Sequence, residues 1–210
     1  MKKFAMAAIL AASSFLSAHA ASITGLVNTG SFASGAQDTN YSLNGTGFGY
    51  VTQDNIWPVG TWIANTTTSK WITPLANQAA SFDPVTKGTY TWSLSFNLAG
   101  FDASTASFSG NFAADNSAVV LLNGNSIGSA NGFTSFSNFS AASGFNSGLN
   151  TLDFVVTNVA QNGGNPTGLR VEFTASNVTP VPEPETYAML LAGLGLMGVI
   201  SRRRAKRNAA

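Results

Sequence analysis

Apolar and polar residues alternate strictly over one long segment near the middle of the chain. Residues 90–98 read Tyr-Thr-Trp-Ser-Leu-Ser-Phe-Asn-Leu. A period of two places every apolar side chain on one face of an extended strand, whereas a helix would spread them around its surface. The segment is therefore predicted to be a β-strand with one buried face.

The same alternation returns in three further segments, residues 106–112, 152–156 and 169–175. A fourth apolar run, residues 118–122, leads into Asn123-Gly124. This dipeptide readily adopts the positive backbone angles of a tight hairpin turn. We expect about eight to ten strands joined by turns, on the basis of such patterns.

Composition supports a fold built of strands. Charged residues make up 9% of the chain, against roughly 25% in ordinary soluble domains, and 21 residues are glycine. We predict an all-β domain, a jelly-roll-like two-sheet sandwich. The first third, from Ala21 to about Ser81, is less regular; short strands and a mobile cover both fit it.

Histidine and cysteine are nearly absent. The chain has no cysteine, and its one histidine lies in Ala18-His19-Ala20, a small-residue cleavage motif. Two lysines and an apolar run precede it, so residues 1–20 are predicted to be a signal peptide, with Ala18 and Ala20 marking the cleavage site. The mature protein would lack Ser-His-Asp triads, thiolate nucleophiles and histidine-bound zinc.

The region between Ala21 and Pro180 is mildly acidic. It holds three cations and seven anions, which gives a net charge of −4. Such a surface offers little to a phosphate backbone, so nucleic-acid binding is not expected. The remaining positive charge lies at the two ends of the chain.

The C-terminal segment has three parts in a fixed order. Residues 181–186 read Val-Pro-Glu-Pro-Glu-Thr, residues 187–200 are largely apolar, and residues 202–207 contain five cations. A helix is expected to begin after Pro184. Fourteen apolar residues would extend about 21 Å, shorter than the roughly 30 Å hydrocarbon core, which predicts a marginal transmembrane helix. The cations would lie on the cytoplasmic side of the inner membrane and the body outside it.

This segment closely resembles the PEP-CTERM sorting tail of Gram-negative bacteria over residues 181–207. The resemblance implies that exosortase, a membrane protease-transpeptidase, is a partner, and that the body then reaches the cell surface or the exopolysaccharide matrix. An ordinary single-span anchor is the alternative. The residues that would form the sorting motif are Pro182, Glu183, Pro184, Arg202, Arg203 and Arg204. The predicted organisation is signal peptide 1–20, sandwich 21–175, tether and Pro-Glu-Pro motif 176–184, and sorting helix with basic cluster 185–207.

A second resemblance covers roughly Trp57 to Ala175. In this order the chain contains Lys70-Trp71-Ile72, Gly88-Thr89-Tyr90, Phe101-Asp102, Ala114-Asp115-Asn116, Leu122-Asn123-Gly124, Gly148-Leu149-Asn150-Thr151-Leu152 and Pro166-Thr167-Gly168-Leu169-Arg170. The series resembles galactose-binding-like β-sandwich modules of exported bacterial proteins. The resemblance implies glycan binding by loops at one end and, in some members, a structural calcium ion.

Five residues are candidates for ligand binding. Trp57, Trp62 and Trp71 lie in irregular chain, where an exposed indole can stack on a sugar ring. The alternative is that they plug one end of the sandwich. Asp115 and Asn116 are expected where one strand ends and the next begins, and there they could contact a ligand or simply cap a turn.

Other residues are expected to be structural. Trp92 falls on the buried face of its strand, and Arg170 and Glu172 are expected to form a surface pair. The carboxylates are scattered singly along the chain, whereas calcium needs six to eight oxygens. We expect no cofactor, although a structural calcium site built from distant loops remains compatible with the sequence.

Three functions remain open. The preferred one is an exported, exosortase-sorted surface or matrix protein that binds polysaccharide without catalysis. The alternative is a structural matrix protein with no specific sugar binding. A glycosidase would need two carboxylates brought together, and no pattern in the sequence predicts such a pair, so we do not expect an enzyme.

Overall fold

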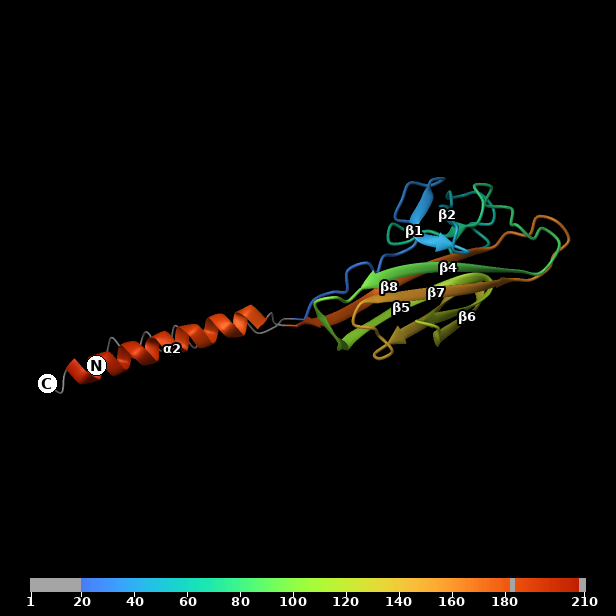
Figure 1. Cartoon of the computed structure of the whole chain (residues 1–210). Helices are drawn as coiled ribbons and strands as arrows, with labels where there is room; N and C mark the ends of the chain where they lie inside the picture. The colour runs from blue at the N-terminus through green and yellow to red at the C-terminus, as the bar shows by residue number, and fades with distance from the viewer. Residues whose placement is uncertain (1–19, 182–183, 208–210) are drawn as a thin grey trace. The chain divides into compact units, whose positions relative to one another are not determined.

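The computed structural model describes residues 20–181 and 184–207 (Figure 1). Residues Ala20–Thr179 form one compact unit, here called the body. The body is mostly β-strand, as predicted. Its strands are β1 (Gln37–Leu43), β2 (Gly47–Val51), β3 (Ile72–Thr73), β4 (Gly88–Asn97), β5 (Phe101–Leu122), β6 (Asn125–Ala141), β7 (Leu149–Asn158) and β8 (Gly168–Pro180).

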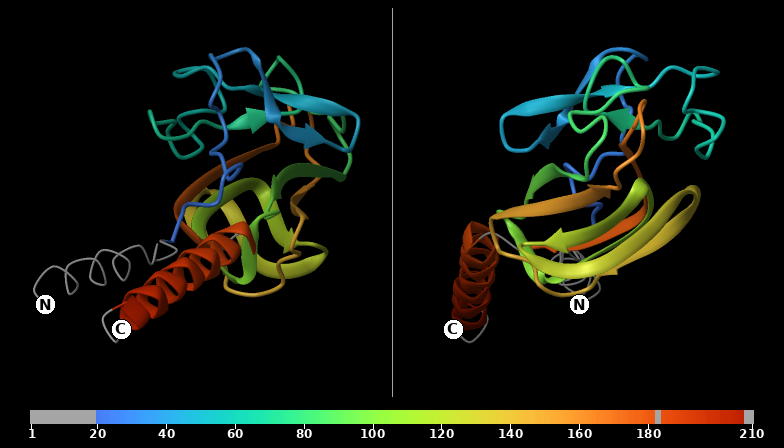
Figure 2. Two further views of the ribbon diagram at one scale, coloured as in Figure 1. Left: turned by 60° about the vertical axis from the view of Figure 1, so that its left-hand side comes forward. Right: turned by 90° about the vertical axis from the view of Figure 1, so that its right-hand side faces the viewer.

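The strands form a sandwich-like sheet in the order β6-β5-β7-β4-β1-β2-β3-β8. A further pairing joins β5 to β8, so the sheet returns on itself and encloses the core (Figure 2). Long β5 takes part in both halves of the sandwich. The predicted all-β, sandwich-like fold is therefore confirmed, with hydrogen bonding that is continuous from one layer to the other.

Strand β4 shows why the alternating segment folds as it does. All ten of its residues pair with β7 in antiparallel register, and Trp92 lies opposite Phe154. Both side chains are fully buried, whereas the intervening Thr and Ser residues are partly or fully accessible. The prediction that Trp92 belongs to the core is confirmed. The core continues through edge-to-face ring contacts among Phe108, Phe112 and Phe139.

The hairpin between β5 and β6 also agrees with the sequence. Asn123 and Gly124 have φ angles of 49° and 83°, as the turn requires. The prediction of separate strands at residues 106–112 and 118–122 was wrong. Residues 101–122 form one strand with register shifts around Ala114. Local irregularities of this kind let a long strand bend without ending.

The expected tether begins too early in the prediction. Strand β8 continues to Pro180, and Val178 is fully buried and paired with Ala21. Residues 176–179 are thus part of the body.

Helix α2 (Pro184–Arg207) follows the body in the chain. It begins at Pro184, whereas the sequence predicted a start just after this residue. Within residues 20–181 and 184–207, no helix has both the length and the hydrophobicity needed to cross a membrane.

Candidate functional site

The three candidate tryptophans have different surroundings. The Trp57 side chain is 50% exposed, whereas Trp62 is 2% exposed and Trp71 is completely buried. Only Trp57 among the three can therefore offer a ring face to a ligand. The prediction of an exposed stacking surface was wrong for the other two.

Trp62 and Trp71 pack together in a small second core. Their ring centroids are 4.5 Å apart, and Ala113, Phe133 and Phe136 surround them. The Trp71 indole nitrogen donates a hydrogen bond to the Ile63 carbonyl at 2.8 Å. A Cβ atom at Gly168 would lie 2.8 Å from the Trp62 ring, so this position admits only glycine without displacement.

Asp115 belongs to the same small core. It lies inside β5 and not in a turn between strands, which corrects the prediction. Its Oδ2 accepts the Trp62 indole N–H at 2.9 Å, and its carbonyl accepts the Thr167 hydroxyl at 2.5 Å. Burial raises the pKa of Asp115 to about 6, and the Trp62 hydrogen bond partly offsets this rise. These contacts give the carboxyl a structural role.

Asn116 hydrogen-bonds the first residue of the loop that follows β7. Its Oδ1 accepts the Val159 N–H at 2.7 Å, across 43 positions of sequence. Like Asp115, it lies inside β5 and not where one strand ends and the next begins. The side chain that was considered for ligand contact thus already supports the chain after β7.

Arg170 is buried, which corrects the expected surface pair. Its side chain is 1% exposed and forms an ion pair of 2.9 Å with Glu172. The guanidinium also donates to Ser69 Oγ, Thr66 Oγ1 and the Ala64 carbonyl, and it lies 5.0 Å from the Phe136 ring centroid. Burial lowers the pKa of Arg170, with the pairing to Glu172 opposing the shift. The hydrogen bonds of Arg170 therefore hold the loop before β3.

Three loops meet at the end of the body where β4 and β8 begin. They are residues 52–71, 74–87 and 159–167, and together they are called the loop end. Buried Gln78 links two of them, because its Oε1 accepts the Gln53 N–H at 2.8 Å and its Nε2 donates to the Ile56 carbonyl at 2.7 Å. Buried Asn165 links the third loop by donating to the carbonyls of Asp83 and Val159, each at 3.1 Å. The loops are therefore held in one arrangement.

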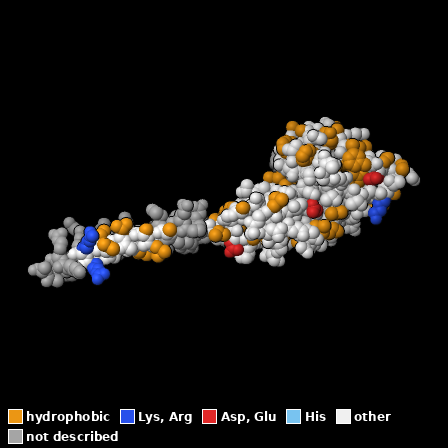
Figure 3. Space-filling view, in the orientation of Figure 1, with side chains coloured by type: hydrophobic (Ala, Val, Ile, Leu, Met, Phe, Trp, Pro, Cys, Tyr) orange, Lys and Arg blue, Asp and Glu red, His pale blue; other side chains and the backbone are white. Residues whose placement is uncertain are grey.

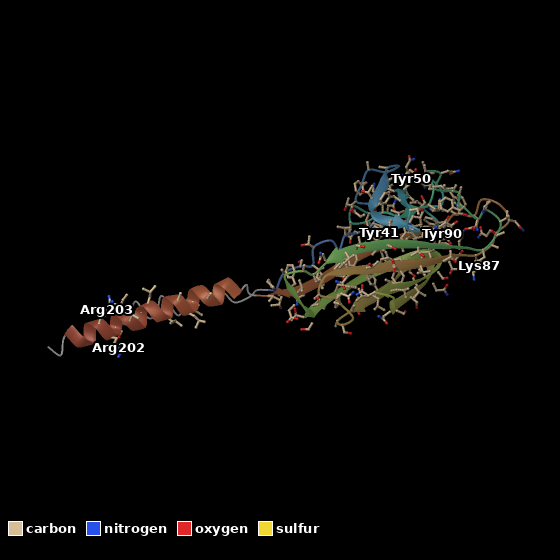
Figure 4. All side chains as sticks on the ribbon, in the orientation of Figure 1. Tyr41, Tyr50, Lys87, Tyr90, Arg202 and Arg203 are labelled. Carbon is tan, nitrogen blue, oxygen red and sulfur yellow. The ribbon has the colours of Figure 1, made fainter. Side chains whose placement is uncertain are left out.

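Tyr90 supports the same end from strand β4 (Figure 4). Its hydroxyl donates to Asp83 Oδ2 at 2.6 Å and accepts the Phe82 N–H at 2.9 Å. Lys87, labelled near Tyr90 in that view, is an exposed cation in the same loop. The backbone around Phe82 is thus anchored, and its ring, which is 54% exposed, stacks on the Tyr90 ring with centroids 5.7 Å apart.

The loop end exposes several large apolar side chains. Those at least 46% exposed are Ile56, Trp57, Phe82, Val85 and Val159, one or two from each loop. Apolar atoms are visible over this part of the body in the face shown in Figure 3. Exposed apolar side chains gathered on fixed loops commonly mark a binding surface. Trp57 was predicted from the sequence; the other four were missed, although Phe82 beside Asp83-Pro84 is an apolar residue in a turn-rich segment.

A second surface was also missed. An open groove of about 580 Å³ lies between residues 22–31, Thr67-Thr68 and residues 173–176 of β8. Hydroxyl and amide groups such as those of Ser22, Asn28 and Thr174 line much of it, and its lining contains no charged side chain. It offers hydrogen bonds but no aromatic face as exposed as that of Trp57.

The described residues contain no group of three or more His, Cys, Asp or Glu side chains placed to hold a metal ion. A structural calcium site, which could also use carbonyl and amide oxygens, stays a prediction.

The C-terminal residues match a known family model. The model of the PEP-CTERM protein-sorting motif covers residues 180–205. The chain carries a PEP-CTERM sorting motif. This motif implies an exported protein that is sorted by exosortase, with a membrane-anchored intermediate during processing.

The sorting residues lie partly within the described structure. Pro184 is the first residue of α2, and Arg202 and Arg203 are exposed in it (Figure 4). Arg204 lies in the same helix. Pro182 and Glu183 fall outside the described residues, as do Ala18 and the predicted signal peptide up to residue 19; Ala20 is the first described residue and is exposed.

Solved structures with a similar body include a carbohydrate-binding module. A family 35 carbohydrate-binding module from an environmental isolate has 13% identity and a TM-score of 0.27, over 78% of this chain and 96% of that one. A β-glucuronidase of an uncultured Clostridium sp. has 13% identity and a TM-score of 0.31, over 69% of this chain and 30% of that one. Such low values assign neither ligand nor activity. No curated protein matches the chain.

Proposed function

We propose that the body binds polysaccharide through the loop end, without catalysis, after exosortase has delivered the protein to the cell surface or matrix. The observation that carries this proposal is the exposed Trp57 ring on loops held by Gln78 and Asn165. An indole face can cover the apolar face of a sugar ring while polar groups beside it bond the hydroxyls. The residues beside Trp57, such as Asp54 and Asn55, are exposed and polar.

The loop end and the sorting tail lie at opposite ends of strand β8. Strand β8 begins at the loop end and runs 13 residues to Pro180, where the sorting motif begins. At about 3.3 Å per residue, the start and end of β8 are about 40 Å apart. The loop end therefore lies far along the body from the point where the sorting tail leaves it.

The experiment measures retention of the body, residues 21–180, on a panel of insoluble polysaccharides, with Trp57→Ala compared against the native sequence. Loss of an aromatic anchor is expected to weaken binding by about tenfold or more, because central tryptophans typically contribute about 2 kcal/mol or more. Free oligosaccharide should release the native body.

Leu149→Ala is the matched control. Leu149 is 64% exposed and lies at the opposite end of β7 from the loop end, nine residues and about 30 Å away. Its retention should equal that of the native body. Equal binding by Trp57→Ala and the native body would exclude the loop end, and a charge introduced by Thr174→Arg would then show whether the groove binds instead.

The alternative function is a structural matrix protein. The exposed apolar side chains of the loop end would then contact other proteins. Absence of sugar-competed retention on every polysaccharide tested would overturn the binding proposal and favour this alternative.

A further inference from the structure

Strand β6 is the edge of the sheet, and it is long. It spans 17 residues, pairs with β5, and ends the strand order on that side. Figure 2 shows it at the margin of its layer. An edge strand presents unpaired N–H and C=O groups that can pair with a strand of another molecule.

The centre of this edge is covered, but its first part is open. The Ile63 N–H donates to the Phe133 carbonyl at 2.8 Å, and Phe133 and Phe136 pack against the small core. Residues 125–131 precede this irregular part and, within the described structure, have ladder partners only on β5. At about 3.4 Å per residue they offer about 24 Å of edge.

This open edge has a register shift at Ile127 but neither of two other common protections, charge and proline. Proteins commonly place lysine, other charges or proline on exposed edges to prevent pairing. No Asp, Glu, Lys, Arg or Pro occurs anywhere in β6. Its open part reads Asn-Ser-Ile-Gly-Ser-Ala-Asn.

We propose that residues 125–131 pair with the same residues of a second copy of this chain, antiparallel and about a twofold axis. Two identical edges can meet in this way because neither carries charge, so no like charges oppose each other. The β4-β7-β5-β6 order of each copy would then continue into β6 of the other. The result is a dimer in which the sheets of the two bodies join edge to edge through β6.

Ser129 and Asn131 face outward from the open edge, and substitutions there provide the test. Ala130 and Gly128 lie opposite Ala118 and Val120 on the core face, whereas Ser129 lies opposite the 39% exposed Val119. Ser129→Lys therefore adds a charge to the edge without entering the core. Asn131→Lys, also at an exposed position, repeats the change two residues away.

Sedimentation velocity of the body over a range of concentrations measures the dimer. The native body is expected to dimerise, and either lysine variant should raise the dissociation constant at least tenfold. Ser95→Lys is the control, because Ser95 is exposed on interior strand β4 and the variant has the same net charge. It should dimerise like the native body.

Amide hydrogen exchange identifies the surface. Protection of residues 125–131 should increase as the native dimer forms. A native body that stays monomeric at millimolar concentration overturns the proposal. So does a dimer that survives both lysine variants, or one that leaves these amides unprotected. Polysaccharide retention by Ser129→Lys separates this proposal from glycan binding, because the loop end is unchanged in that variant.

Discussion

Two tryptophans five positions apart, in one loop, have opposite surroundings. Trp62 lies in the small core with its indole N–H bonded to Asp115, whereas Trp57 is half exposed at the loop end. Local sequence does not distinguish them, because both lie in chain interrupted by Pro and Gly. The difference comes from strand β5 and the start of β8, which provide a carboxylate and a glycine that fit the Trp62 ring. The same residue type thus stabilises the fold at one position and is available for binding at the other.

The largest expected effect is on stability. Trp71→Ala removes a completely buried ring and should lower the free energy of unfolding by about 3–5 kcal/mol. Trp57→Ala should change it by no more than about 0.5 kcal/mol, since half of its side chain faces solvent. Urea unfolding of the body measures both. Equal losses would remove the distinction between the two regions.

A somewhat smaller effect follows from the pKa of Asp115. Its value of about 6 in the folded protein exceeds the ordinary 3.8, so between these values the folded state binds more protons than the unfolded state. The Asp115 contribution to stability therefore increases as pH falls from 7 to 4, by up to about 3 kcal/mol. Burial also raises the pKa of Asp38, which acts in the same direction.

The Asp115 contribution is isolated by comparison with Asp115→Asn. The variant keeps an oxygen that can accept the Trp62 N–H, but it cannot titrate. Its free energy of unfolding should depend less on pH than that of the native body. Asp54→Asn, at an exposed site, serves as the control. Parallel pH profiles for the native body and Asp115→Asn would contradict the buried, titrating carboxyl.

The smallest of the three effects concerns how the loops are held. Gln78→Ala removes bonds that join residues 53 and 56 to the second loop and should cost about 1–3 kcal/mol. Polysaccharide retention should fall with it, because Trp57 would lose its fixed position. Retention measured below the unfolding transition tests this. Unchanged retention would mean that Trp57 needs no support from Gln78.

The parts of the fold that were predictable depend on local pattern. The alternation over residues 90–98 defines β4, and Asn123-Gly124 defines a turn by its backbone preference. Strand β5 was divided because Asp115-Asn116 is typical of turns, and its pairing with three other strands overrides that preference. No local pattern shows such long-range support.

The candidate site was only partly predictable for the same reason. Trp57 was identified, but its separation from Trp62 and Trp71 depends on contacts with residues about 50 to 100 positions away. Arg170 alternates with apolar residues and was expected at the surface, yet the loop before β3 covers it and supplies its hydrogen-bond acceptors. Charge alone does not reveal such a cover.

One measurement tests the export of the body and the removal of its sorting tail together. The intact mass of the protein recovered from the surface and medium of its native host tests the central claim that the body is exported and released from its tail. We predict a chain that begins at Ala21 and ends near Pro184, with any attached cell-surface group as a defined added mass. A membrane-bound form that still contains Arg202, Arg203 and Arg204 as the final product would contradict exosortase sorting.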